Sequence, residues 1–310
     1  MNILFMGTPD FAVVSLNALA KAGHNISAVV TMPDKPRGRG HKMVHTPVYD
    51  AAETLGAQIF TPENLKRENF EVTLNQINPD VIVVVAYGHI LPEYVLNFPK
   101  YGCINVHASL LPRYRGAAPI QRSIIDGETV TGVTTMFMEK GLDTGDMLMK
   151  TSVNITEEDN FETLHDKLAD VGADLICKTL DAILNGTCIP EKQDDSLSDY
   201  AHMITKETCL INWNKDARDI FNLVRGLYPV PKAFTNYGTK QMKILSCRVA
   251  SDKSDSTPGT IFKVGASSFF VACANNTSVE VTAIQPEGKK MMSVSDYLKG
   301  NSIELNSLLK

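Results

Sequence analysis

The chain has 310 residues, 44% of them hydrophobic, which is more than one average domain and enough to bury a sizeable core. No apolar run approaches the ~20 residues that a membrane-spanning helix needs, and the six cysteines contain no C-x-x-C pair, which favours reduced thiols over a disulfide framework or a zinc site. Charge is uneven, because residues 1–205 carry 16 Lys or Arg against 26 Asp or Glu whereas residues 206–310 carry 14 against 9. The basic second part points to a polyanionic partner, and the lack of a targeting signal predicts a cytoplasmic protein.

Residues 1–150 alternate apolar runs with segments of helical spacing. We expect strands at residues 2–6, 26–31, 58–60, 81–85, 102–107 and 132–138, and helices at residues 11–22, 48–55 and 68–76. The continuous β-branched run at residues 81–85 suits a strand that is buried on both faces of a parallel sheet. Strands separated by helices predict βαβ units, and hence an α/β, Rossmann-like domain with a mostly parallel sheet.

The pattern changes after a long amphipathic helix, which we expect at residues 161–184. Residues 190–205 are polar and begin with a proline, which predicts an interdomain linker. One more helix, at residues 216–227, precedes short strands expected at residues 232–236, 241–248, 259–264, 268–272 and 278–283. We therefore expect a catalytic domain over residues 1–189, the linker, and a small OB-like β-barrel over residues 206–310.

Asn105 and His107 stand at the end of the strand expected at residues 102–107. Side chains alternate along a strand, so these two point one way while Ile104 and Val106 point the other way into apolar packing. Open α/β sheets bind their ligands at the carboxyl ends of strands. An amide beside an imidazole there offers a donor to a developing oxyanion, next to a group that handles protons.

Asp143 is the expected third member of this site. It lies between two glycines in residues 141–146, directly after the strand expected at residues 132–138. We expect this loop to lie across the same sheet edge as His107, where a carboxylate favours the charged imidazole and fixes its orientation. Asp143 is preferred to Asp146, which is closer to the next strand, and a solvated loop acid is the alternative interpretation.

Two further segments have features of ligand contacts. Residues 33–42 hold two prolines, two glycines and four cations, which predicts a basic loop able to grip phosphates, or else a plain surface loop. The run 81–85 leads into Tyr87 and Gly88, where exposed backbone groups could hydrogen-bond to the edge of a flat heteroaromatic ligand. The alternative interpretation is an ordinary strand followed by a turn. The chain lacks G-x-G-x-x-G, G-x-x-x-x-G-K-[ST] and H-E-x-x-H, which disfavours dinucleotide, ATPase and zinc-hydrolase sites.

Taken together, these residues resemble the folate-dependent formyltransferases. Asn105-x-His107 with Asp143 is similar to the catalytic trio of that superfamily. A more specific similarity lies in S-L-L-P-R-Y-R-G-A-A-P-I at residues 109–120 and M-G-T-P-D-F-A at residues 6–12, which resemble the members whose acceptor is methionyl-initiator tRNA. The resemblance extends over the whole chain, and the barrel is its least diagnostic part.

The resemblance implies an enzyme that needs no metal. Nothing in the sequence suggests an obligate interface, so we expect a monomer. Its reaction would be formyl transfer from 10-formyltetrahydrofolate to the α-amine of methionine esterified to initiator tRNA. Asn105 would donate to the oxyanion, His107 would stabilise it or relay the amine's proton, and Asp143 would orient the imidazole.

The resemblance also suggests where the two substrates bind. The residues expected to border tetrahydrofolate are Ser109, Leu110, Leu111 and Pro112, to which the turn after residues 81–85 adds Tyr87 and Gly88. The acceptor end of the tRNA is expected to meet the basic loop, at Arg37, Arg39 and Lys42, and the barrel is expected to hold the body of the tRNA.

Three alternatives stay open at this point. A formyltransferase acting on glycinamide ribonucleotide or an amino sugar would share the catalytic domain but would not require a basic loop and a basic second domain. A hydrolase would let water replace the amine and would consume 10-formyltetrahydrofolate without an acceptor. A non-catalytic RNA-binding protein would not depend on Asn105 or His107.

Overall fold

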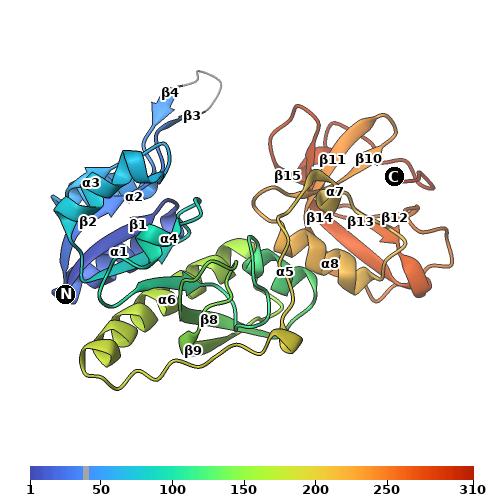
Figure 1. The fold of residues 1–310 in the computed structure, drawn as a ribbon. Helices are drawn as coiled ribbons and strands as arrows, with labels where there is room; N and C mark the ends of the chain where they lie inside the picture. Colours follow the sequence, from blue (N-terminus) through green and yellow to red (C-terminus); the bar gives the residue numbers. More distant parts are fainter. Residues whose placement is uncertain (38–41) are drawn as a thin grey trace. The chain divides into compact units, whose positions relative to one another are not determined.

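The computed structural model describes residues 1–37 and 42–310, which form two compact units (Figure 1). The first unit comprises Met1–Gly116, Val130–Asn154 and His165–Ala201, and the second comprises Ala117–Thr129, Ile155–Leu164 and His202–Lys310. Each unit is thus assembled from three separate stretches of sequence. Within the described ranges, no helix combines the length and the apolar character that crossing a bilayer requires.

A seven-stranded sheet forms the centre of the first unit, in the order β5-β2-β1-β6-β7-β8-β9. The first five of these strands pair in parallel, whereas β8 runs antiparallel to β7 and β9 antiparallel to β8. The bounds are β1 Asn2–Gly7, β2 Asn25–Val30, β5 Ile59–Phe60, β6 Val81–Val85, β7 Cys103–His107, β8 Val130–Phe137 and β9 Met147–Asn154. The expected α/β fold with a mostly parallel sheet is confirmed.

Helices cover both faces of this sheet. On one face, Leu4 and Ile82 of the sheet belong to a buried cluster with Phe70 of α3. On the other face α6 approaches so closely that a Cβ at Gly172 would lie 3.0 Å from Cγ1 of Val106, which explains the glycine. The helices are α1 Asp10–Lys21, α2 Pro47–Thr54, α3 Arg67–Ile77, α4 Glu93–Leu96, α6 Phe161–Leu184, which enters this unit at His165, and the short 3₁₀ turn Asp195–Leu197.

A two-stranded antiparallel hairpin stands between β2 and α2. It consists of β3 (Lys35–Arg37) and β4 (Lys42–Val44). The sequence predicts a loop here, and this is wrong for the residues that pair. Pro36 has no backbone N–H to donate, but it is tolerated here because both strands of a two-stranded hairpin are edge strands, in which some backbone positions make no hydrogen bond between strands.

An antiparallel sheet forms the centre of the second unit, in the order β10-β11-β14-β13-β12 with β15 paired to β14. The bounds are β10 Ala233–Tyr237, β11 Lys240–Val249, β12 Ile261–Val264, β13 Phe269–Ala272, β14 Ser278–Pro286 and β15 Met292–Ser293. Leu309 bridges to Tyr237 of β10 and Leu308 bridges to Thr260 just before β12, so residues 308–309 link the two edge strands. This closure fits the small β-barrel that the sequence predicts.

The core of the second unit lies between this sheet and α8. Trp213 is buried there, and its indole N–H donates to Oγ1 of Thr235 at 3.0 Å. The helices are α5 Pro119–Ile125, α7 Lys206–Cys209, α8 Ala217–Gly226, α9 Val294–Leu298 and the 3₁₀ turn Ala274–Asn276, of which the sequence predicts α8 alone. All six cysteines of the chain are free thiols, and four are buried.

Candidate active site

Strand β7 carries Asn105 and His107 on one face of the sheet. Ile104 and Val106 point to the opposite face and are 0% and 4% exposed, as strand alternation predicts. His107 is buried, whereas Asn105 is partly exposed. In the described part of the chain, nothing hydrogen-bonds to the side-chain amide of Asn105. That amide is therefore free to donate to a ligand oxygen.

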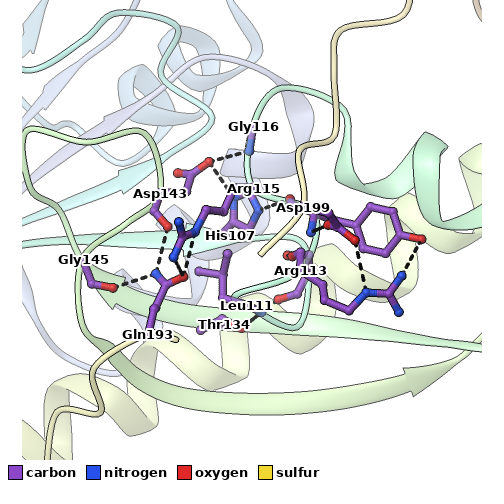
Figure 2. A network of polar contacts seen from close by, with 12 residues as sticks. His107, Leu111, Arg113, Arg115, Gly116, Thr134, Asp143, Gly145, Gln193 and Asp199 are labelled. Atoms are coloured by element: carbon purple, nitrogen blue, oxygen red, sulfur yellow. Dashed lines mark hydrogen bonds and ion pairs between the residues drawn. The ribbon is translucent and has the colours of Figure 1, made fainter. Parts of the chain in front are cut away.

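The imidazole of His107 faces an oxygen at each of its nitrogens (Figure 2). Nε2 lies 2.9 Å from the carbonyl oxygen of Tyr114, which only accepts, so Nε2 carries a proton and donates it. Nδ1 lies 3.7 Å from Oδ2 of Asp143, an ion-pair separation that is too long for a direct hydrogen bond. The carboxylate is thus placed to balance a proton held at Nδ1.

Asp143 is held in place by the backbone around it. The N–H of Gly116 donates to Oδ2 of Asp143 at 2.8 Å, which fixes the oxygen that faces His107. Asp143 has φ of 53°, in the left-handed region that Asp tolerates better than most residues. Asp143, and not Asp146, is the carboxylate beside the imidazole, as the sequence predicts.

Asp143 reaches His107 by a different route from the expected one. The sequence predicts that its loop leaves a strand end at the same sheet edge as His107, and this is wrong. Because β8 runs antiparallel to β7, His107 pairs with Thr134, and Phe137 at the end of β8 lies beside the start of β7. The loop between β8 and β9 therefore folds back toward His107. Gly145 permits this path, since a Cβ there would lie 1.9 Å from the carbonyl oxygen of Phe137.

A buried glutamine, Gln193, fastens this loop (Figure 2). Its Nε2 donates to the carbonyl oxygens of Asp143 at 2.8 Å and Gly145 at 2.7 Å. Its Oε1 accepts from Nε and Nη2 of Arg115 at 2.9 and 2.8 Å, and Nη2 also pairs with Asp195 at 2.8 Å. Arg115 is only 2% exposed, so a buried charge is tied to the position of the Asp143 loop.

No local pattern in the sequence indicates a role for Gln193 or Arg115. Arg115 lies in residues 109–120, and the family resemblance of that segment is the only feature that marks it. Gln193 lies in residues 190–205, the segment expected as a linker, and the described residues up to Ala201 belong to the first unit. Asp199 in the same segment pairs with Arg113 at 3.2 Å and accepts from the backbone N–H of Tyr114.

The turn after β7 is braced by Thr134. Its hydroxyl donates to the carbonyl oxygen of Ser109 at 2.7 Å and accepts from the N–H of Leu111 at 3.1 Å. Ser109 and Leu111 are buried, whereas Leu110 and Pro112 are partly exposed. Of the four residues expected to border the folate, Leu110 and Pro112 thus have the accessible side chains.

Tyr87 and Gly88 follow β6 with the tyrosine side chain directed into the core. Tyr87 is 2% exposed, its hydroxyl is the one buried side-chain polar atom without a partner in the described residues, and burial raises its pKa to about 12. Its carbonyl oxygen accepts from Oγ1 of Thr8 at 2.6 Å. Gly88 has φ of 100°, which favours glycine. Any ligand contact at this turn would therefore involve backbone groups.

The basic hairpin carries the residues expected to meet RNA. Arg37 ends β3 and Lys42 begins β4, while Arg39 lies outside the described residues. Behind the hairpin, Nδ1 of His45 lies 2.8 Å from Oδ1 of Asp34, and the His45 ring stacks on Tyr49 at 4.0 Å. The hydrogen bond to Asp34 is the main cause of a raised pKa for His45, which favours a further positive charge here.

Comparison with known families shows which family this chain belongs to. A model described as "Formyl transferase" matches residues 1–180, and one described as "Formyl transferase, C-terminal domain" matches residues 203–302. The chain belongs to the formyl transferase family. It is 49% identical over 311 residues to a protein of Caldanaerobacter subterraneus subsp. tengcongensis, with full coverage of both chains, and 47% identical to one of Lachnospira eligens, with 100% and 99% coverage. Both relatives are named methionyl-tRNA formyltransferase.

The fold is shared with solved structures of other proteins. The sugar 3N-formyl transferase WlaRD, determined in the presence of dTDP and 5-N-formyl-THF, matches with a TM-score of 0.67 at 19% identity, over 94% of this chain and 99% of that one. Among the residues that the structure describes, no group of three or more His, Cys, Asp or Glu side chains is arranged to hold a metal ion.

Proposed function

We propose that this formyl transferase moves the formyl group of 10-formyltetrahydrofolate to the α-amino group of methionyl-initiator tRNA. One observation carries the proposal: the unpaired amide of Asn105 lies on the same strand face as a His107 imidazole backed by Asp143. Relatives that are 47–49% identical over the full chain, and named for that reaction, support the choice of acceptor.

Asn105 and His107 would act on the two events of formyl transfer. The amine nitrogen attacks the formyl carbon and the carbonyl electrons move onto oxygen, where the Asn105 amide donates a hydrogen bond. Collapse of this intermediate breaks the bond from carbon to N10, and the proton lost from the amine is returned to N10. One such donor is worth about 10²–10³ in rate, and positioned proton transfer about 10²–10⁴.

His107 would work through Nδ1, because the Tyr114 carbonyl holds the proton at Nε2. A proton at Nδ1 makes the ring positive, and the Asp143 carboxylate 3.7 Å away stabilises that charge. Asp143 therefore orients the ring and supports its charged form while Nδ1 gives or takes a proton. Catalytic hydrogen bonds are often this long in a free enzyme and shorten when the substrate binds.

Separate surfaces would hold the two substrates. Ser109, Leu110, Leu111 and Pro112, with the backbone of Tyr87 and Gly88, would border the folate. Arg37, Arg39 and Lys42 would contact the acceptor end of the tRNA. The excess of positive charge in residues 206–310 would attract the body of the tRNA. Because charged tRNA is its proposed acceptor, we propose that the enzyme acts in the cytoplasm. We also propose that it is a monomer, since nothing in the sequence suggests an obligate interface.

The direct test is an acid-gel mobility assay of methionyl-tRNA incubated with the protein and 10-formyltetrahydrofolate. We expect initiator tRNA to become blocked at its amine and elongator tRNA to stay unmodified. Use of glycinamide ribonucleotide or an amino sugar in place of tRNA would contradict the proposal. So would release of formate and tetrahydrofolate without any acceptor, which would indicate a hydrolase.

A further inference from the structure

The segment of residues 113–116 contacts both members of the His107–Asp143 pair. The carbonyl oxygen of Tyr114 accepts from Nε2 of His107 at 2.9 Å. The N–H of Gly116 donates to Oδ2 of Asp143 at 2.8 Å. Two backbone groups that are two residues apart thus hold the imidazole and the carboxylate. A displacement of this segment would therefore disturb both side chains at once.

The backbone of this segment is strained at Tyr114. Its φ is 58°, in the left-handed region that residues with a bulky side chain rarely adopt. A residue keeps such a conformation only where the surrounding structure holds it there, and residues of this kind cluster at active sites. The direction of the carbonyl group that meets His107 therefore depends on the groups that hold Tyr114.

Residues 199–201 lie beside this segment and hold it through the backbone. The N–H of Arg115 donates to the carbonyl oxygen of Asp199 at 3.0 Å, and the N–H of Ala201 donates to the carbonyl oxygen of Arg115 at 2.7 Å. The two stretches pair in parallel at this point. Their approach is close, because a Cβ at Gly116 would lie 3.1 Å from the carbonyl oxygen of Ala201.

The side chain of Asp199 adds a contact to Tyr114 itself. Its Oδ1 accepts from the backbone N–H of Tyr114, and its Oδ2 pairs with Nε of Arg113 at 3.2 Å (Figure 2). The side chains of Asp199 and Arg113 are 44% and 49% exposed, so their ion pair stabilises little by itself. Tyr114 is only 7% exposed, and a buried N–H needs an acceptor. The carboxylate therefore matters chiefly as an acceptor for this N–H.

We propose that Asp199 is a positioning residue of the active site. By accepting from its N–H, the Asp199 carboxylate holds Tyr114 in the left-handed conformation, so that the Tyr114 carbonyl keeps a proton on Nε2 of His107 and leaves Nδ1 facing Asp143. The effect on formyl transfer rests on the proposed function, whereas the effect on the imidazole does not. The site then includes a residue beyond the range 1–180 that the formyl transferase model matches.

The first experiment observes the imidazole without any substrate. Asp199→Asn and Asp199→Leu are variants of nearly equal size, but only asparagine keeps an oxygen that accepts from the Tyr114 N–H. Nitrogen NMR of the full chain with labelled histidine follows the ring of His107, whose signal is identified by its absence from His107→Ala. We expect the Nε2 proton to persist in Asp199→Asn and to exchange with water at least about tenfold faster in Asp199→Leu.

The second experiment measures steady-state formyl transfer and the Tm of the same variants. We expect Asp199→Leu to lower kcat about 10–10²-fold with the KM for both substrates little changed, and Asp199→Asn to keep kcat within about threefold of the wild type. If Asp199→Leu does not fold, Asp199→Ser replaces it, because the serine oxygen is one bond closer to the backbone and is withdrawn from the Tyr114 N–H.

The outcomes separate this inference from the proposed function. An unchanged His107 signal in Asp199→Leu would overturn the positioning role, whatever the kinetics. Equal losses in the Asn and Leu variants would also overturn it, because they would assign the effect to the charge that pairs with Arg113, whose guanidinium lies 4.9 Å from the centroid of the Tyr114 ring. If the wild type formylates no tRNA, the proposed function fails, and the NMR experiment still decides whether Asp199 holds the imidazole.

Discussion

Replacement of Gln193 by leucine removes the clamp on the Asp143 loop while keeping a side chain of similar size. The change deletes two hydrogen bonds to the carbonyls of Asp143 and Gly145, and two from Arg115. The neutral bonds are worth about 0.5–1.5 kcal/mol each and those from a charged donor about 1.5–3 kcal/mol each. Gly145 and Arg115 are buried, so water cannot replace all of these bonds, and we expect a local destabilisation of about 4 kcal/mol or more.

The assay combines kinetics with hydrogen exchange at one amide. The N–H of Gly116 is bonded to Asp143, so its protection reports directly on the position of the carboxylate. We expect Gln193→Leu to lose this protection and to lower kcat about 10²-fold, with the KM for both substrates little changed. Lys192→Ala, at an exposed neighbouring position, is the control. A normal kcat with a rapidly exchanging Gly116 amide would refute the view that the Asp143 position limits catalysis.

Three further predictions follow from the site and the hairpin. Asn105→Ala should lower kcat about 10²–10³-fold without weakening folate binding in a titration, and a change in folate affinity alone would contradict its role as an oxyanion donor. Gly145→Ala should lower the Tm, because the new Cβ meets the carbonyl oxygen of Phe137, and an unchanged Tm would show that the loop has another path. The raised pKa of His45 means that its pair with Asp34 stabilises the fold below pH 6.5 and that this contribution is lost as pH rises through the folded pKa. The Tm difference between wild type and His45→Asn should therefore be larger at pH 6 than at pH 8, and a constant difference would contradict it.

The sequence predicts an element correctly where a local pattern of residues determines that element. The continuous β-branched run of β6 and the helical spacing of α6 each fix an element with the bounds that the structure shows. Alternation along β7 was enough to place Asn105 and His107 on one face and Ile104 and Val106 on the other.

The rest depends on pairing between distant residues, about which local patterns carry no information. The direction of β8 is set by its partner and not by its own residues, so the route of the Asp143 loop could not be derived. In the basic hairpin β3 pairs with β4, although the prolines and glycines of residues 33–42 predict a loop. Gln193 meets Arg115 across 78 positions of sequence, and neither residue lies in a periodic pattern that indicates the contact.

If Asn105, His107 and Asp143 act together on one reacting carbon, then the loss of one of these side chains must slow the transfer step itself. The deciding measurement is single-turnover transfer of isotopically labelled formyl from 10-formyltetrahydrofolate to methionyl-initiator tRNA, with tRNA binding measured in parallel. We expect labelled amine with the wild type and a rate at least about 10²-fold lower for Asn105→Ala and for His107→Ala, with tRNA binding retained. Unchanged transfer in either variant, or label recovered as formate with the wild type, would contradict this joint action.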